Sequence, residues 1–253
     1  MVSHATVATG MDSKKEIDAP GGHQWLEACG FNLRAVLDIN SFGTDLARAW
    51  SDSGVSAERH ERLVLLGMGG SLLWNHLQQA GAQGENIFDS FSKEAVATVC
   101  SRFWGDQAAR FLYPGEALIP LQQLGRWAGW STPSPLGLDI SPIFGPWFAF
   151  RAAFLTSAPL PFSERVPAVA PCGVCETKPC VDACPAQAVQ ADATLNLGDC
   201  LAQRFDDPLG CGMRCAARLA CPVGASWRYS PEHLDYHGAR SLEVLNRWGR
   251  ARR

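Results

Sequence analysis

The chain has 253 residues, of which 47% are hydrophobic and 19% are charged, and its formal net charge is −3. This composition excludes an intrinsically disordered chain and leaves room for one large or two modest folded domains. The net charge gives no global attraction to nucleic acid, and no apolar run reaches the roughly 18 residues of a membrane span. The chain begins without a charged segment followed by an apolar one, which favours a cytoplasmic protein.

The first 160 residues alternate between helix-like and strand-like patterns. Residues 1–22 are small, polar and mixed, and they predict a flexible N-terminal arm. Periodicity and turn residues then predict helices over 23–29, 44–50, 72–80, 88–104 and 118–127, and strands over 33–39, 62–66 and 108–113. This alternation indicates a layered α/β or α+β domain over residues 23–160. Cys29 and Cys100 within it are expected to be buried thiols.

A glycine-rich stretch, residues 67–71, follows the predicted strand over 62–66 and precedes a predicted helix. Free backbone N–H groups at such a junction can bind phosphate. The pattern is neither G-x-G-x-x-G nor a Walker loop, so a plain tight turn is the alternative.

Glycine and proline turns separate short apolar segments between residues 124 and 155. We expect the segments on either side of residues 141–146 to pair as a hairpin. Arg151 interrupts the second apolar segment. A charge there must be paired, or it must face a pocket that binds an anion.

Eight of the ten cysteines lie between residues 172 and 221, in two sets that each end in Cys-Pro. Eight thiols in two such sets are the number needed for two 4Fe-4S clusters, with the fourth cysteine of each run ligating the other cluster. This rule predicts a first cysteine group of Cys172, Cys175, Cys180 and Cys221, and a second cysteine group of Cys184, Cys200, Cys211 and Cys215.

Zinc and disulfides are the alternative uses of these thiols. Two zinc sites of four thiolates would fit the number, but zinc chemistry does not require a proline after each last cysteine. Disulfides need an oxidising compartment. The spacing is longer than in a simple ferredoxin, which loop closure tolerates at about 0.6 kcal/mol per doubling of length. We therefore expect a ferredoxin-like dicluster domain over residues 161–230, after a proline-rich linker.

Residues 231–253 are expected to form a C-terminal helix with a basic tail, with Ser230 as its cap and Pro231 in its first turn. His233 and His237 are spaced i, i+4 and could bind a metal. Because no third ligand stands nearby, a solvated helix face is favoured.

Two segments carry a resemblance to known families. A Gly-Leu-x-Ile-x-Pro-x-Phe-Gly-Pro segment followed by two ferredoxin-like cysteine sets resembles the epoxyqueuosine reductases and the reductive dehalogenases. Phe144-Gly-Pro-Trp-Phe-Ala-Phe-Arg151-Ala, with Arg228-Tyr-Ser-Pro-Glu232, is more similar to the CblC-type cobalamin-processing proteins. The resemblance covers residues 108–245. It implies an α+β architecture: a nitroreductase-like α/β domain that binds a corrinoid, followed by the dicluster domain and the C-terminal helix.

The resemblance also implies roles for individual residues. Trp147, Phe148, Phe150 and Arg151 would line the corrinoid cavity, and Arg151 would also contact a thiol co-substrate, as its counterpart in CblC-type proteins does. Tyr113 is the only phenol positioned as a dehalogenase acid would be. The chain departs from the families in having serine at 141, where CblC-type proteins have histidine, and no clear counterpart of the reductases' catalytic aspartate between residues 110 and 121.

These features predict an iron–sulfur oxidoreductase that passes electrons from a low-potential donor (a flavodoxin, a ferredoxin or a reductase) to a bound corrinoid. Cobalamin would be reduced or would lose its upper ligand. The alternative enzyme is an epoxyqueuosine reductase-like protein acting on tRNA, which requires a basic surface. The arginines available for it are Arg240, Arg247, Arg250, Arg252 and Arg253. A ferredoxin-type electron carrier with a docking domain is the third alternative.

Overall fold

The structure is a computed structural model that describes residues 17–58, 61–105, 109–192 and 194–251. Its centre is a four-stranded sheet in the order β1 (Leu33–Leu37), β2 (Arg62–Gly69), β6 (Phe148–Thr156) and β3 (Arg110–Tyr113). All neighbouring strands are antiparallel. β2 and β6 occupy the middle because both are apolar runs that can be buried on two faces.

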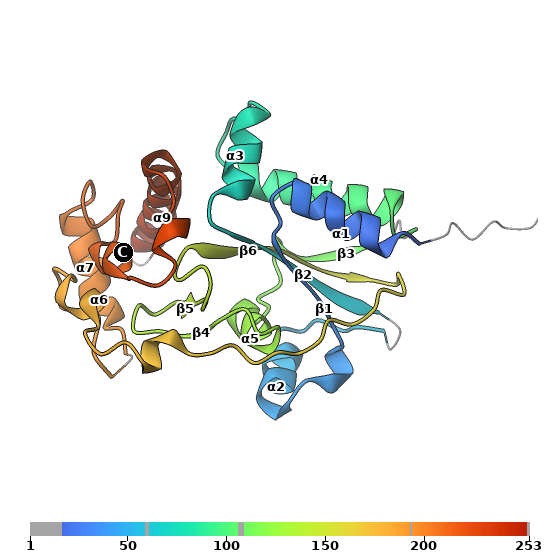
Figure 1. Ribbon diagram of the computed structural model, residues 1–253. Coiled ribbons are helices and arrows are strands. Elements are labelled where there is room, and N and C mark those ends of the chain that lie inside the picture. Colours follow the sequence, from blue (N-terminus) through green and yellow to red (C-terminus); the bar gives the residue numbers. More distant parts are fainter. Residues whose placement is uncertain (1–16, 59–60, 106–108, 193, 252–253) are drawn as a thin grey trace, which may run out of the picture.

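Helices cover both faces of this sheet (Figure 1). α1 (Ala19–Ala28), α3 (Leu72–Gln79) and α4 (Ile87–Arg102) lie on one side, and α2 (Thr44–Asp52) and α5 (Leu121–Trp127) lie on the other. Side chains of β2 alternate between the two cores: Val64 and Leu66 pack with the first layer, and Leu63 and Leu65 with the second. The mixed layered fold expected from the sequence is confirmed. α1 begins four residues earlier than expected, so the last part of the predicted arm is helical.

The predicted hairpin around residues 141–146 is wrong. The short strands β4 (Thr132–Pro133) and β5 (Asp139–Ile140) pair with each other, and β6 enters the main sheet between β2 and β3. A single bridge between Ser141 and Gly145 closes the turn that connects the two sheets. The apolar run after this turn gains more from burial between β2 and β3 in the main sheet than from pairing with a two-residue strand.

The glycine-rich stretch forms the end of a strand and a tight turn, and two of its N–H groups have partners within the protein. β2 continues through Gly69, and Gly70 makes the turn with a φ of 69°. The Gly69 N–H donates to the Asn32 side chain at 2.7 Å, and the Gly70 N–H donates to the Trp147 carbonyl at 2.8 Å. These two donors are already used, so they are not free to bind an anion.

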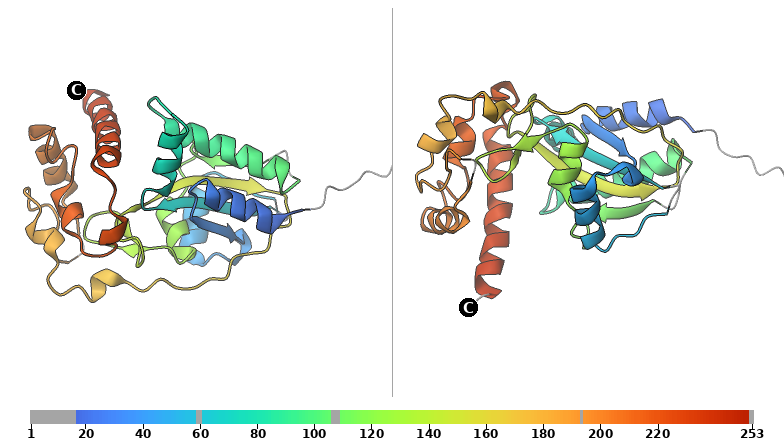
Figure 2. Two further views of the ribbon diagram at one scale, coloured as in Figure 1. Left: turned by 45° about the horizontal axis from the view of Figure 1, so that its top comes forward. Right: turned by 90° about the horizontal axis from the view of Figure 1, so that it is seen from below.

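The cysteine segment, residues 172–222, lies at one end of the molecule (Figures 1 and 2). It contains α6 (Pro179–Asp182), α7 (Leu197–Asp206) and α8 (Ala216–Ala220), with 3-10 turns at Pro171–Gly173 and Ala225–Trp227 on its borders. Another 3-10 turn, Ile39–Ser41, follows β1. A small apolar cluster joins the segment to the loop before β5, because Leu136 packs with Val189 and Ala217.

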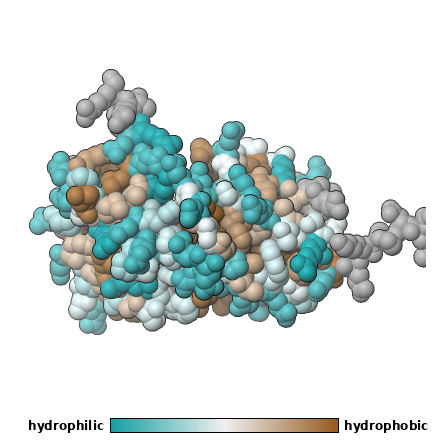
Figure 3. Space-filling view, turned by 90° about the horizontal axis from the view of Figure 1, so that it is seen from above, coloured by the Kyte–Doolittle hydropathy of each residue, from teal (hydrophilic) through white to brown (hydrophobic). Residues whose placement is uncertain are grey.

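The C-terminal helix α9 (Pro231–Ala251) runs between the cysteine segment and the helical layer of α3 and α4 (Figure 2). Ser230 caps it as predicted, since its hydroxyl accepts from the His233 N–H at 3.3 Å. No helix within the described ranges is long and apolar enough to cross a bilayer. On the face drawn in Figure 3, hydrophobic residues are interspersed with hydrophilic ones.

Candidate functional site

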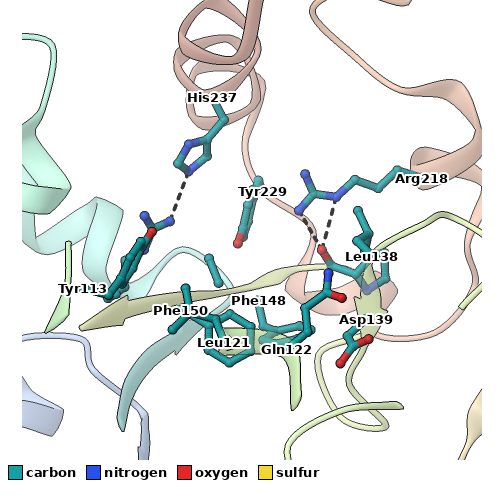
Figure 4. A pocket seen from close by; sticks show the side chains of 13 residues that line it. Tyr113, Leu121, Gln122, Leu138, Asp139, Phe148, Phe150, Arg218, Tyr229 and His237 are labelled. Atoms are coloured by element: carbon teal, nitrogen blue, oxygen red, sulfur yellow. Dashed lines mark hydrogen bonds between the residues drawn. The ribbon is translucent and has the colours of Figure 1, made fainter. Parts of the chain in front are cut away.

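A cavity of about 470 Å³, here named the Arg151 pocket, opens beside the first half of β6 (Figure 4). Its size is within the range of small-molecule pockets, and aromatic, apolar and a few charged groups line it. Its walls come from β3, α5, the loop before β6, α8 and α9. The lining residues are Tyr113, Leu121, Gln122, Leu138, Asp139, Pro146, Phe148, Ala149, Phe150, Arg151, Arg218, Tyr229 and His237.

Arg151 is the buried charge of this pocket, with 8% of its surface exposed. Its guanidinium lies over the Phe88 ring at 4.1 Å and makes a long hydrogen bond of 3.5 Å from Nη2 to His237 Nε2. Its Nε has no hydrogen-bond partner, and no carboxylate of the described residues forms an ion pair with it. Burial lowers the pKa of Arg151, but a guanidinium stays protonated in proteins. Among the described residues Arg151 therefore has no ion-pair partner and lines a pocket; that the pocket binds an anion stays a prediction.

The sequence favoured a solvated face for His233 and His237, but the structure places both imidazoles inside the protein. His233 is fully buried and stacks between Tyr229, at 4.0 Å, and Trp74, at 4.8 Å. Its Nε2 lies 3.0 Å from Nε2 of His237, and its Nδ1 lies 3.2 Å from the Ser71 hydroxyl. Burial, followed by the charge of Arg151, lowers the pKa of His233 to about 3 and that of His237 to about 2. Both imidazoles are therefore neutral at pH 7.

Asp139 and Arg126 form a conventional ion pair on the opposite wall. Arg126 donates to both oxygens of Asp139, at 3.0 Å from Nε and 2.7 Å from Nη2. The Ser131 hydroxyl donates to Asp139 Oδ2 at 2.9 Å. The carboxylate is 3% exposed and accepts from both side chains, so its charge is compensated by Arg126.

Arg218 reaches the pocket from α8, the helix between Cys215 and Cys221. Its Nε and Nη2 donate to the Pro146 carbonyl at 3.2 and 2.6 Å, and its guanidinium lies over the Trp147 ring at 4.7 Å. Trp147 itself is fully buried beneath this contact and is not among the residues that line the pocket. Trp147 was predicted to line the cavity, but it does not line the Arg151 pocket.

The other resemblance-based positions do line the pocket. Phe148, Phe150 and Arg151 project from β6, and Tyr113 projects from the end of β3. Burial raises the pKa of Tyr113, with Arg151 acting in the opposite direction. The phenol is thus protonated at neutral pH and available as a hydrogen-bond donor. The cofactor-binding and catalytic roles of these four residues stay predictions.

The eight cysteines of the cysteine segment influence one another within the two predicted groups. Burial raises the pKa of Cys172, and the nearby thiols of Cys221, Cys180 and Cys175 raise it further. In the second group, burial raises the pKa of Cys211, and Cys215, Cys200 and Cys184 add to the rise. None of the ten cysteines is in a disulfide, and Cys29 and Cys100 are buried in the sheet domain as expected.

Each predicted cysteine group supplies four thiols, the number that a 4Fe-4S cluster needs. Four thiols gathered in one place need a cationic group to stabilise them together as thiolates. Among the residues that the structure describes, no three histidine, cysteine or acidic side chains could together hold a metal ion. A single zinc, with Zn–S bonds of about 2.3 Å, would draw four sulfur atoms tightly together, whereas each iron of a cluster carries its own thiolate.

The lining residues that sequence reasoning missed include Arg218, Tyr229 and Asp139, and it misjudged His237. A signal existed for Tyr229 and His237. Together with His233 they recur every four residues and so share one side of the chain around the start of α9. No local pattern marks Arg218 or Asp139, because their neighbours in the pocket are distant in sequence.

No family model matches the chain, and no curated protein matches it. Solved structures do. An epoxyqueuosine reductase bound to an epoxyqueuosine-modified tRNA-Tyr stem loop has 14% identity and a TM-score of 0.56, over 85% of this chain and 68% of that one. The reductase from Bacillus subtilis has 15% identity and a TM-score of 0.54 over the same shares. The C. elegans B12-trafficking protein CblC has 14% identity and a TM-score of 0.51, over 91% of this chain and 96% of that one. The chain therefore has a mixed α/β fold related to those of epoxyqueuosine reductase and CblC.

Proposed function

We propose that this chain is an iron–sulfur oxidoreductase whose two cysteine groups each hold a 4Fe-4S cluster and whose Arg151 pocket faces a bound corrinoid. Cobalamin would be the group that is reduced or that loses its upper ligand. When bound, the clusters would supply single electrons at a potential tuned by their surroundings. The donor would be a low-potential protein such as a flavodoxin, a ferredoxin or a reductase.

One observation carries the proposal: the cysteine segment and the Arg151 pocket share a wall. α8 lies between Cys215 of the second group and Cys221 of the first, and its Arg218 donates to the Pro146 carbonyl at the pocket rim. Gly137 and Leu195 also touch, because a side-chain carbon on Gly137 would lie 2.4 Å from Leu195. An electron source and a ligand site in such contact are what a redox enzyme requires.

The residues of the pocket would bind and orient the part of the ligand that enters it. Phe148 and Phe150 offer apolar ring surfaces, Arg151 offers a charge, and Tyr113 offers a hydroxyl proton. A thiol co-substrate is proposed beside Arg151, because an uncompensated guanidinium favours a thiolate or a carboxylate. The likeness of the whole chain to the CblC fold supports cobalamin as the ligand.

Two measurements on the anaerobically purified chain test this proposal. Iron analysis should find about eight irons per chain, and Cys221→Ser should lower the count to about four, because it removes one ligand of one cluster. Cys29→Ala, in the sheet domain, should leave the iron count unchanged. Adding cobalamin should shift its absorbance bands. An unchanged cobalamin spectrum with the clusters present would exclude a corrinoid.

The second candidate is a reductase acting on a modified nucleoside in tRNA, which the fold likeness to epoxyqueuosine reductases favours. Its predicted basic surface is weakened by ion pairs: Arg240 contacts Glu85 and Glu243, and Arg247 contacts Glu243. The side chains of Arg250, Arg252 and Arg253 lie outside the described residues. Nucleoside analysis of tRNA from a deletion strain distinguishes the two, since unaltered queuosine would exclude this activity. The third candidate, a pure electron carrier, predicts cluster signals with no ligand bound in the pocket.

A further inference from the structure

The hydrogen bonds behind Arg151 form a continuous chain, Ser71–His233–His237–Arg151, that links three elements of the fold. Ser71 lies at the start of α3, the two histidines lie on α9, and Arg151 lies on β6. The successive contacts are 3.2 Å, 3.0 Å and 3.5 Å. The Ser71 hydroxyl makes no capping bond to α3, so it is directed to His233 instead.

The chemistry of Arg151 determines where the protons lie along this series of hydrogen bonds. A guanidinium has donors and no acceptor, so His237 Nε2 must accept from Arg151. That nitrogen carries no proton, and His233 Nε2 must therefore carry one in order to donate across the 3.0 Å contact. His233 Nδ1 is then the acceptor, and Ser71 donates to it. The single lone pair of His237 Nε2 is then shared between the His233 donor at 3.0 Å and the Arg151 donor at 3.5 Å, and both imidazoles are neutral and in opposite tautomers.

We propose that His237, backed by His233 and Ser71, is a positioning residue that directs the Arg151 guanidinium into the pocket without neutralising its charge, for an anionic group of the ligand. An arginine is more commonly oriented by a carboxylate, which satisfies its donors but cancels its charge. The imidazole lone pair of His237, which Arg151 shares with His233, accepts from the guanidinium and leaves its full charge. The inference rests on the proposed function only in taking the cavity as a ligand site.

The surroundings of His237 keep it neutral. The charged or titratable groups that face it are Arg151 from β6, Arg218 from α8, His233 and Tyr236 from its own helix and Tyr229 from the segment before it. The cations among them oppose a second proton on the ring, as burial does, and no carboxylate is among the groups that perturb it. A neutral acceptor is thus the stable state of His237 at physiological pH.

The proton positions are measured on the wild-type chain, purified with its clusters oxidised, by long-range ¹H–¹⁵N NMR of the histidine rings at pH 7. His237 should carry its proton on Nδ1 and His233 on Nε2. A proton on His237 Nε2, or a doubly protonated ring, would overturn the inference without recourse to any variant.

Ligand positioning is measured by calorimetry with a matched pair of probes, 3-phenylpropionate and its uncharged amide, chosen because Phe148 and Phe150 line the pocket. The acid should bind more tightly than the amide. His237→Leu should weaken the acid about tenfold and leave the amide unchanged, because a hydrogen bond to a charged group is lost. His237→Gln, whose side-chain oxygen can accept, should recover part of the difference, and Ser71→Ala should lose less than His237→Leu.

Equal binding of acid and amide to the wild-type chain, or an equal loss of both in His237→Leu, would overturn the proposal and leave His237 a packing residue. These outcomes are independent of the cobalamin titration. A chain that binds the acid through Arg151 and still leaves the cobalamin spectrum unchanged would contradict the proposed function and keep this inference.

Discussion

Arg151 and Arg126, the ion-pair partner of the pocket residue Asp139, have opposite surroundings. The Arg126 side chain is 39% exposed and is held by both oxygens of Asp139. Arg151 is 8% exposed, and the groups that hold it are a neutral imidazole and a phenyl ring. The exposed cation has a carboxylate partner and the buried cation has none, which is the reverse of what stability alone would favour.

The difference separates a structural arginine from one held ready for a ligand. Arg126 ties α5 to β5 and fixes one wall, and its charge is compensated before any ligand arrives. Arg151 brings a charge that has no ion-pair partner among the described residues into an aromatic cavity, where the low dielectric strengthens its attraction for an anion. Buried charges kept without a partner mark functional sites more often than structural ones.

The largest expected effect is a loss of stability at acidic pH, which tests whether His233 and His237 behind Arg151 are neutral. Their folded pKa values, about 3 and about 2, lie below the ordinary value of 6.5, so the folded state binds fewer protons than the unfolded state below pH 6.5. The contribution of the two neutral histidines to the free energy of unfolding should therefore be fully present above pH 6.5. It should be lost progressively as the pH is lowered toward 3. Between pH 7 and pH 5 the loss is on the order of 2–4 kcal/mol for the pair. Urea unfolding measures it.

His237→Leu is the control for this pH effect, since it removes one of the two titrating groups. The decline in stability between pH 7 and pH 5 should become about half as steep. An equally steep decline in the variant would assign the acid sensitivity to groups away from the pocket.

Removing the carboxylate from the conventional pair should destabilise the fold. Asp139→Leu leaves the Ser131 hydroxyl and two Arg126 donors without their acceptor. We expect a loss of about 2–3 kcal/mol, kept moderate by the exposure of Arg126 to water. Asp139→Asn retains one acceptor oxygen and should lose about half as much in urea unfolding. No loss in Asp139→Leu would remove the structural role of this pair.

The same kind of change at Arg151 should have the opposite sign. Arg151→Met replaces a buried, uncompensated cation with an apolar side chain of similar length, and His237 Nε2 keeps His233 as its donor. The free energy of unfolding should rise by about 1–2 kcal/mol while binding of 3-phenylpropionate is lost. Arg126→Met, the matched change, should lower stability. A destabilised Arg151→Met would mean that Arg151 holds the fold together.

The smallest effect concerns Arg218, an arginine whose partner is a backbone carbonyl. Arg218→Lys should cost about 1 kcal/mol, because an ammonium cannot reproduce the two parallel bonds to Pro146 and stacks less well on Trp147. Arg214→Lys on the exposed pair with Asp235 should change stability little. Equal effects of the two substitutions in thermal unfolding would show that the Pro146 contact contributes nothing.

Local sequence signals predicted what depends on neighbours along the chain. The apolar run of β2, the cap at Ser230 and the cysteine sets with their prolines all belong to single segments. The partners of those segments could not be predicted in this way. The run that became β6 was assigned to a hairpin with its nearest neighbour, but in the fold it pairs with strands that lie about 40 and 90 residues earlier.

The candidate site was predictable to the same extent. An arginine in an apolar strand left two outcomes open, an ion pair or a pocket. Among the described residues no carboxylate forms an ion pair with Arg151, and its side chain lines the pocket. The i, i+4 histidines placed two imidazoles on one face of α9. Whether water or protein covered that face depended on Trp74 and Phe88, which lie about 150 residues earlier.

Two glycines face each other where the cysteine segment meets the pocket. Gly145 and Gly224 both have left-handed φ values, 59° and 66°. A side-chain carbon on Gly145 would lie 1.9 Å from the Val223 carbonyl oxygen, and one on Gly224 would lie 2.2 Å from the Phe144 carbonyl carbon. The spacing between the loop that leaves Cys221 and the turn that leads into β6 is therefore set by peptide groups in contact, not by side chains. Sequence drift around these loops can alter the polarity of the boundary and leave its width unchanged, provided that both glycines remain.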